Sequence, residues 1–236
     1  MGSAGSNSNL STESLMDRKA ECISHIIQQN AGNDIRSALV VGCGSGLEAA
    51  ILSTTLGIKV IGIDLRTDFN PIAAKAAQLQ QGDATCLEFE DGQFDLVYSY
   101  HALEHILNYR QALAEMNRVL KFGGWYCIGT PNRSRLVGYI GSEGTKLTKK
   151  IQWNLTDWKA RLTGKFRNEF GAHAGFTGPE LSGDLKQVFG TPMDITLPYY
   201  LRLYPGYQTL LRGLTNTGLS RFIFPSIYYM GRKHAA

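Results

Sequence analysis

The sequence predicts an α/β fold, a doubly wound and mostly parallel sheet of seven strands with a helical lid insertion. Short, mainly apolar runs at residues 38–41, 60–63 and 94–98 are typical of parallel strands that are buried on both faces. Segments of helix length separate these runs. The first run ends at three alternating glycines, which indicate a sharp turn from a strand into a helix.

The length of 236 residues suits one domain. We expect residues 1–10, which are rich in Gly, Ser and Asn, to be a disordered tail, and residues 11–236 to form the domain. Ser11 is the expected N-cap of a helix before the first strand.

Composition excludes several classes of protein. The chain has 24 basic and 20 acidic residues, a net charge of +4 that is far from the basic face of a nucleic-acid binder. No apolar run approaches the roughly 20 residues that span a bilayer. The four cysteines form no C-x-x-C pair, so we expect no metal site and no disulfides, with reduced thiols in a cytoplasm: Cys22, Cys43, Cys86 and Cys127.

The glycine-rich turn after the first strand predicts a binding site, here called the corner, for a nucleotide-type ligand. Gly42, Gly44 and Gly46 permit a close approach of the backbone to a ligand. Asp64 ends the next strand, where its carboxylate can accept both hydroxyls of a ribose. Dinucleotide folds need G-x-G-x-x-G, but Leu47 stands at the last position, so the pattern is G-x-G-x-G.

The next elements follow from periodicity. We expect a helix at residues 71–80 and a strand at 94–98. A further helix is expected at 109–120, where Leu113, Met116 and Val119 form one apolar face. Two glycines end it before a fifth strand at 125–129.

The corner and the segment 92–132 together resemble the class I S-adenosyl-L-methionine (SAM)-dependent methyltransferases. The closest likeness is to the type 11 group, which contains the ubiquinone- and menaquinone-biosynthesis enzymes. The signature FDxVxxxxxLEH…RVLKPGG…PN is matched in register, with Phe122 in place of its proline. The resemblance implies a Rossmann-like fold, SAM as the cofactor and S-adenosyl-L-homocysteine (SAH) as its product.

The resemblance also implies which residues hold the cofactor, all near the carboxyl ends of strands. In that family an aspartate at the place of Asp83 reads the adenine amino group; the alternative is that Asp83 only caps a turn. The expected cofactor residues are Gly42, Cys43, Gly44, Gly46, Asp64, Leu65, Asp83, Ala84, Ser99 and Tyr100.

Methyl transfer needs a general base only if the acceptor atom starts protonated. His101, just beyond the fourth strand, is the best placed candidate, with His105 and His173 behind it. The alternative is that Glu104 and His105 bond to the backbone or to each other. Residues 99–102 lack the Asn/Asp-Pro-Pro element of methyltransferases that act on amide or nucleobase nitrogens. A small-molecule acceptor with an oxygen or nitrogen nucleophile is therefore favoured, and carbon less so.

The segment of about residues 132–176 is long for a connection and carries nine basic and three acidic residues. An apolar stripe predicts an amphipathic helix in it: Leu147, Ile151, Leu155, Trp158 and Leu162. Such a helix either covers the cofactor crevice as a lid or only packs on the core. A basic lid favours an acidic or phenolic acceptor.

The remaining chain predicts a helix at 180–189 capped by Thr177, a sixth strand at 193–197, a short helix at 206–219 and an antiparallel strand at 222–230. The aromatic residues of this tail either contact a hydrophobic acceptor or a membrane surface, or pack in the core.

Three functions stay open at this stage. The first is a SAM-dependent methyltransferase. The second is a nicotinamide-dependent oxidoreductase, disfavoured by Leu47 and by the lack of a Tyr-x-x-x-Lys pair, since Glu143 follows Tyr139. The third is a non-catalytic SAM- or SAH-binding module, suggested only by Val40, where the family often has an acidic residue. The sequence leaves the oligomeric state open.

Overall fold

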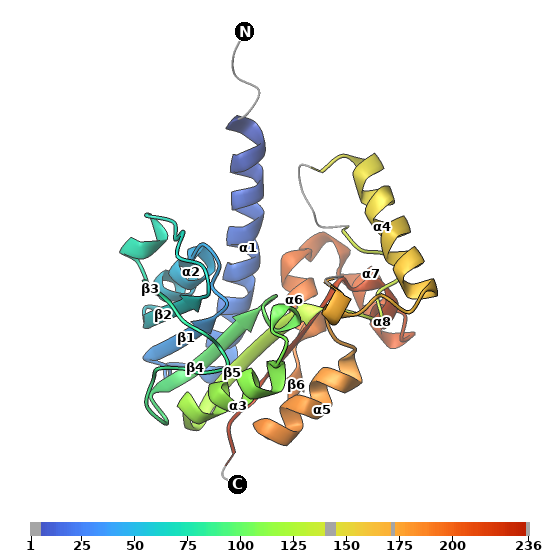
Figure 1. The fold of residues 1–236 in the computed structure, drawn as a ribbon. Helices are drawn as coiled ribbons and strands as arrows, with labels where there is room; N and C mark the ends of the chain where they lie inside the picture. Colours follow the sequence, from blue (N-terminus) through green and yellow to red (C-terminus); the bar gives the residue numbers. More distant parts are fainter. Residues whose placement is uncertain (1–5, 140–144, 171–172, 235–236) are drawn as a thin grey trace.

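The computed structural model describes residues 6–139, 145–170 and 173–234, and its centre is a sheet of seven strands. The strand order is β3-β2-β1-β4-β5-β7-β6 (Figure 1). Strands β1 to β5 are parallel, and β7 runs antiparallel to both β5 and β6. The bounds are β1 Ser37–Val41, β2 Lys59–Asp64, β3 Gln78–Gln81, β4 Phe94–Tyr100, β5 Leu120–Pro131, β6 Met193–Asp194 and β7 Ser226–Arg232. The predicted fold class is confirmed.

Helices cover both faces of the sheet. Ala38 and Val40 of β1 point into one core, which α1 (Ser6–Ala31), α2 (Leu47–Leu56) and α6 (Thr196–Leu203) complete. Leu39 and Val41 point into the other core, beneath α3 (Tyr109–Val119) and α5 (Gly178–Val188). The remaining helices are α4 (Leu147–Leu162), α7 (Gln208–Asn216) and α8 (Ser220–Ile223). Among the described residues, no helix combines the length and apolarity that crossing a membrane requires.

The chain's first helix begins earlier than expected. Helix α1 starts at Ser6, so the expectation of disorder is wrong for residues 6–10, while residues 1–5 lie outside the described part. Ile23, Ile26 and Ile27 are buried and hold the second half of α1 on the sheet. The helix continues from this packed half toward its amino end, past the expected cap at Ser11.

The prediction of a helix at residues 71–80 is also wrong. The structure has one short 3-10 turn at Ala73–Lys75, and residues Gln78–Gln81 pair with β2 as the edge strand β3. Three of the four residues of β3 are glutamines. A polar edge strand lacks the apolar run by which buried strands are recognised, so the sequence pattern did not predict β3.

The carboxyl-terminal elements are shifted against the prediction. Strand β6 ends at Asp194 because α6 begins at Thr196. Helix α8 takes the first residues of the expected last strand, so β7 starts at Ser226. Helix α7 covers only part of the expected 206–219.

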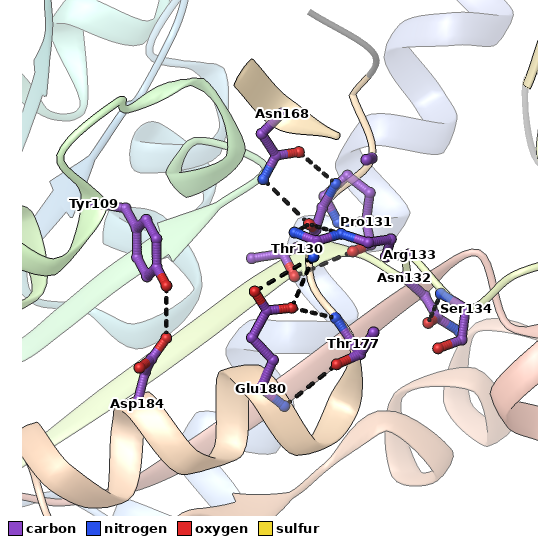
Figure 2. Close-up of polar contacts among 12 residues, drawn as sticks. Tyr109, Thr130, Pro131, Asn132, Arg133, Ser134, Asn168, Thr177, Glu180 and Asp184 are labelled. Carbon is purple, nitrogen blue, oxygen red and sulfur yellow. Dashed lines mark hydrogen bonds and ion pairs between the residues drawn. The ribbon is translucent and has the colours of Figure 1, made fainter. Parts of the chain in front are cut away.

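The predicted cap of α5 is confirmed. Thr177 Oγ1 accepts a hydrogen bond from Glu180 N at 3.3 Å, and Glu180 Oε2 accepts one from Thr177 N at 3.2 Å (Figure 2). This reciprocal capping box satisfies two backbone donors. Asp184, one turn further along, accepts a hydrogen bond from the Tyr109 hydroxyl at 2.8 Å and joins α5 to α3.

Candidate active site

Two neighbouring cavities lie at the carboxyl ends of the central strands. The first, here called the corner pocket, has a volume of about 740 Å³ and is bounded by the turns after β1, β2, β3 and β4. The second, here called the tyrosine pocket, has a volume of about 530 Å³ and is bounded by β4, the 132–176 insertion, α6 and β7. His101 and His105 line both cavities, so the two pockets meet at these side chains.

The glycines of the corner have different roles. Gly42 has φ 74°, and a Cβ there would collide with Ala102 Cβ, so this glycine permits close packing. Gly44 has φ 55°, and a Cβ there would have no heavy atom within 4 Å. Because Gly44 lines the corner pocket, that open space is available to a ligand.

Asp64 shapes the corner with both of its carboxylate oxygens. Oδ2 accepts a hydrogen bond from Gly44 N at 2.8 Å, and Oδ1 accepts one from Arg66 N at 3.0 Å. Each carboxylate oxygen can accept more than one hydrogen bond. Asp64 therefore holds the turn and still has acceptor capacity for a ligand in the corner pocket.

Asp83 caps a turn, as the simpler alternative predicted. Its Oδ1 accepts hydrogen bonds from Thr85 N and Thr85 Oγ1, both at 2.8 Å, and these bonds lower its pKa. Asp83 and Thr85 both line the corner pocket, so the cap does not remove Asp83 from the candidate site.

Six of the ten expected cofactor residues line the corner pocket: Gly42, Gly44, Asp64, Leu65, Asp83 and Ala84. Three others are not among its lining. Cys43 is buried next to Gly62, Gly46 leaves room for Leu79 at the start of α2, and Ser99 is fully buried in β4. Burial raises the pKa of the Cys43 thiol to about 12. The fourth, Tyr100, lines the tyrosine pocket instead.

The tyrosine pocket gathers the three predicted histidines around a buried carboxyl group. Glu104 Oε1 lies 4.0 Å from His101 Nδ1 and 3.9 Å from His105 Nε2, and the Glu104 side chain is only 1% exposed. Glu104 Oε2 is buried without a hydrogen-bond partner. The ring centroids of His105 and His173 are 4.6 Å apart. No group of three or more His, Cys, Asp or Glu residues in the described chain is arranged to hold a metal ion.

Backbone strain is concentrated at the tyrosine pocket. Across the described residues, the non-glycine side chains with positive φ are those of His101 (51°), Tyr139 (63°) and His173 (41°). All three line this pocket. A conformation of this kind persists only where the surrounding structure enforces it, and such residues cluster at functional sites.

Burial changes the charges in the pocket. Burial raises the pKa of Glu104 to about 7. Burial and the charges of Lys19 and Arg135 lower the pKa of His101 to about 3, and burial also lowers that of His105. At neutral pH His101 is therefore uncharged, and Glu104 is near its titration midpoint.

The raised pKa of Glu104 predicts a pH-dependent loss of stability. Between about pH 4.5 and 7 the native carboxyl keeps a proton that the unfolded chain releases, so the free energy of unfolding falls as pH rises through this window. Glu104→Gln removes the titrating carboxyl group and therefore this fall in the free energy of unfolding. We expect the variant to gain stability relative to the natural protein by up to about 3 kcal/mol between pH 5 and pH 8. Urea unfolding at both pH values measures the difference; a gap that does not change with pH would contradict the assignment.

Tyrosines form most of the remaining wall. Tyr199, Tyr200 and Tyr228 are buried, and Tyr228 stacks on Tyr100 at 5.9 Å between centroids. Ser226 Oγ lies 2.9 Å from His101 Nε2. The sequence left open whether aromatic residues of the tail contact an acceptor or a membrane surface, or pack in the core; these tyrosines are in the core and also line the pocket.

Hydrogen bonds join the two ends of the insertion to each other, but the insertion is not a lid on the corner pocket. Phe176 N donates to Pro131 O at 3.0 Å, and Arg133 and Asn168 both donate to Gly175 O (Figure 2). Arg135, Tyr139 and His173 of the insertion line the tyrosine pocket, whereas no described residue of 132–176 lines the corner pocket. The predicted helix is present as α4, but it lines neither pocket, and none of its residues is buried.

Part of the chain matches a known protein family. Residues 39–128 match the model of a family described as a methyltransferase domain. A demethylmenaquinone methyltransferase of Staphylococcus carnosus is 40% identical over 95 residues, which is 37% of this chain and 39% of that protein. The chain spans less than half the length of the curated relatives it matches.

Solved structures share the fold at low identity. Phosphoethanolamine N-methyltransferase 2 of Haemonchus contortus, solved with SAM bound, has a TM-score of 0.55 at 19% identity, covering 90% of this chain and 52% of that one. The cyclase SpnF has a TM-score of 0.55 at 16% identity, covering 92% and 81%. The family match confirms the predicted resemblance to methyltransferases over residues 39–128, and the solved structures share the fold.

Proposed function

Because residues 39–128 match the model of a methyltransferase domain, we propose that the chain transfers a methyl group from SAM to an oxygen or nitrogen of a small-molecule acceptor. The observation that carries the proposal is the meeting of two pockets at His101 and His105. In this assignment the corner pocket holds the cofactor, the tyrosine pocket holds the acceptor, and transfer takes place where they join.

The corner pocket fits SAM in size and in its donors and acceptors. Its volume of about 740 Å³ lies in the range of cofactor pockets. Asp64 would accept the two ribose hydroxyls, and Asp83 the adenine amino group. Leu65 and Leu107 line the pocket and are 69% and 89% exposed, so an adenine ring placed between them would cover apolar surface. Gly44 leaves the space that the methionine end needs.

SAM supplies an electrophilic methyl group on its sulfonium sulfur, so the protein's task is mainly to position the acceptor. Tyr100, Tyr199 and Tyr228 would pack against an apolar or aromatic acceptor. Lys19 and Arg135 line the tyrosine pocket with one carboxyl group, Glu104. This excess of positive charge favours an acceptor that carries an acidic or phenolic group.

His101 is the proposed general base for a hydroxyl acceptor. Its ring is neutral and lies at the junction of the pockets; because its pKa is about 3, it would take the proton that the hydroxyl loses only where an ionised neighbour stabilises the imidazolium. The imidazolium formed would lie 4.0 Å from Glu104 Oε1. Ionised Glu104 would stabilise that charge, so we expect the turnover rate to rise with pH through about 7.

Asp64→Ala should weaken SAH binding by about 1.5–3 kcal/mol, since charge-assisted hydrogen bonds to the ribose are lost. Loss of the contacts to Gly44 N and Arg66 N also loosens the corner, which favours the upper part of this range. The matched control is Asp68→Ala, an exposed carboxylate that does not line the pocket, although its ion-pair partner Arg66 does. Titration calorimetry with SAH measures both variants; equal affinity for Asp64→Ala and Asp68→Ala would refute the role of Asp64.

Incubation with methyl-labelled SAM and fractions of a metabolite extract tests the function itself. We expect label in a small molecule that absorbs as an aromatic or binds an anion exchanger, in proportion to the amount of enzyme. SAH binding without any labelled product in any fraction would instead support a non-catalytic binding module.

A further inference from the structure

The apolar stripe of α4 faces solvent rather than the protein. Its five side chains are between 45% and 89% exposed: Leu147, Ile151, Leu155, Trp158 and Leu162, here called the α4 stripe. Leu136 and Val137 beside the helix are also exposed, at 54% and 42%. An exposed apolar surface of this extent marks a site of contact with a partner or a membrane.

Side chains on the polar side of α4, together with the indole N–H of Trp158, hold the helix on the protein. Asn154 bonds Gly138 N at 2.7 Å, and Arg161 donates to Arg133 O at 2.8 Å. Trp158 Nε1 donates to Leu136 O at 2.7 Å while the residue stays 45% exposed. The helix is therefore fixed in an orientation that presents the stripe outward, and Figure 1 shows α4 standing at the edge of the molecule.

Basic residues surround the stripe. Residues 146–167 contain seven basic side chains and one acidic side chain, Asp157, which pairs with Arg135. At 3.6 residues per turn, Lys159 falls on one flank of the stripe and Lys150 on the other. This pattern is typical of helices that lie in the surface of an anionic membrane, with apolar side chains in the acyl boundary and lysines at the headgroups.

We infer that α4 binds the surface of an anionic lipid bilayer through the α4 stripe. Charge argues against a second copy as the occupant, because pairing two stripes would bring two such basic segments together. The tyrosine pocket lies beside this contact, since Arg135 and Tyr139 line the pocket and also bond Asp157 of α4. A lipophilic acceptor could then pass from the bilayer to the pocket; that consequence rests on the proposed function, whereas lipid binding does not.

Flotation with vesicles tests the inference without any measurement of activity. The full chain should float with vesicles of phosphatidylcholine and phosphatidylglycerol in equal parts and stay unbound with phosphatidylcholine alone. Salt at about 0.5 M should weaken the binding, because it screens the lysines. Leu155→Glu with Trp158→Glu should reduce the bound-to-free ratio at least about tenfold, and Lys146→Gln with Lys159→Gln and Lys165→Gln should reduce it as well.

The matched control is Phe122→Glu. Phe122 is 72% exposed and lies near the amino end of β5, whereas Pro131 at the carboxyl end lines the tyrosine pocket. This variant should float like the natural protein. Absence of the natural protein from the anionic vesicles would overturn the inference, as would equal flotation of the stripe variant and the control. A stripe-dependent dimer in light scattering, without vesicle binding, would assign the stripe to a second copy instead.

Discussion

Gly44→Val should abolish detectable binding of SAM and SAH, a loss of at least about 100-fold or roughly 2.7 kcal/mol, while the protein stays folded. The structure places no heavy atom within 4 Å of a Cβ at this position, so the new side chain projects into the corner pocket rather than into the protein. A branched residue at φ 55° also strains the turn that Asp64 holds. Titration calorimetry with SAH measures the affinity, and circular dichroism follows the fold.

Gly57→Val is the matched control. Gly57 ends the same helix, α2, that follows Gly44, has φ 66°, and likewise has no heavy atom within 4 Å of a built Cβ. It does not line the corner pocket. The control carries the same backbone strain and should bind SAH normally. Normal binding by Gly44→Val, or equal loss in both variants, would place the cofactor elsewhere.

His101→Asn should lower turnover of a hydroxyl acceptor by about 10²–10⁴-fold and leave SAH affinity within a few-fold. Asparagine tolerates the positive φ of this position, so the variant removes the base, and with it the Nε2 contact to Ser226, without changing the backbone. The loss should appear in kcat rather than in KM, because the tyrosines that bind the acceptor remain.

The control for this variant is His25→Asn, on the exposed side of α1 and outside both pockets. Its turnover should equal that of the natural protein. Unchanged kcat in His101→Asn would exclude His101 as the base and indicate an acceptor that is already deprotonated when it binds.

Local patterns predicted the parts of the fold that depend on local contacts. The run before Gly42 predicted β1, because both of its faces are buried and every residue from Ala38 to Val41 is apolar. Strand β3 escaped detection because an edge strand of glutamines has no such run. The stripe predicted α4 within its observed bounds, but periodicity alone does not say whether an apolar face meets the protein or something else.

The candidate site likewise has one part that local sequence patterns predict and one part that they do not. Gly44 and Asp64 are joined by a short βαβ segment, and the motif predicted both as parts of one binding site; their hydrogen bond is a further finding of the structure. The tyrosine pocket is assembled from residues as distant in sequence as Tyr100, Tyr139 and Tyr228. No spacing in the sequence relates those residues, so only the fold brings them together. Burial of Glu104 likewise depends on elements from both halves of the chain.

The central claim is that the pocket formed by Gly44 and Asp64 binds SAM, and titration of the purified full chain with SAH tests it most directly. We predict saturable binding at one site, loss of that binding in Gly44→Val, and no competition by NAD. Absence of SAH binding to the natural protein, or displacement of SAH by NAD, would contradict the claim and favour an oxidoreductase-type site at this corner.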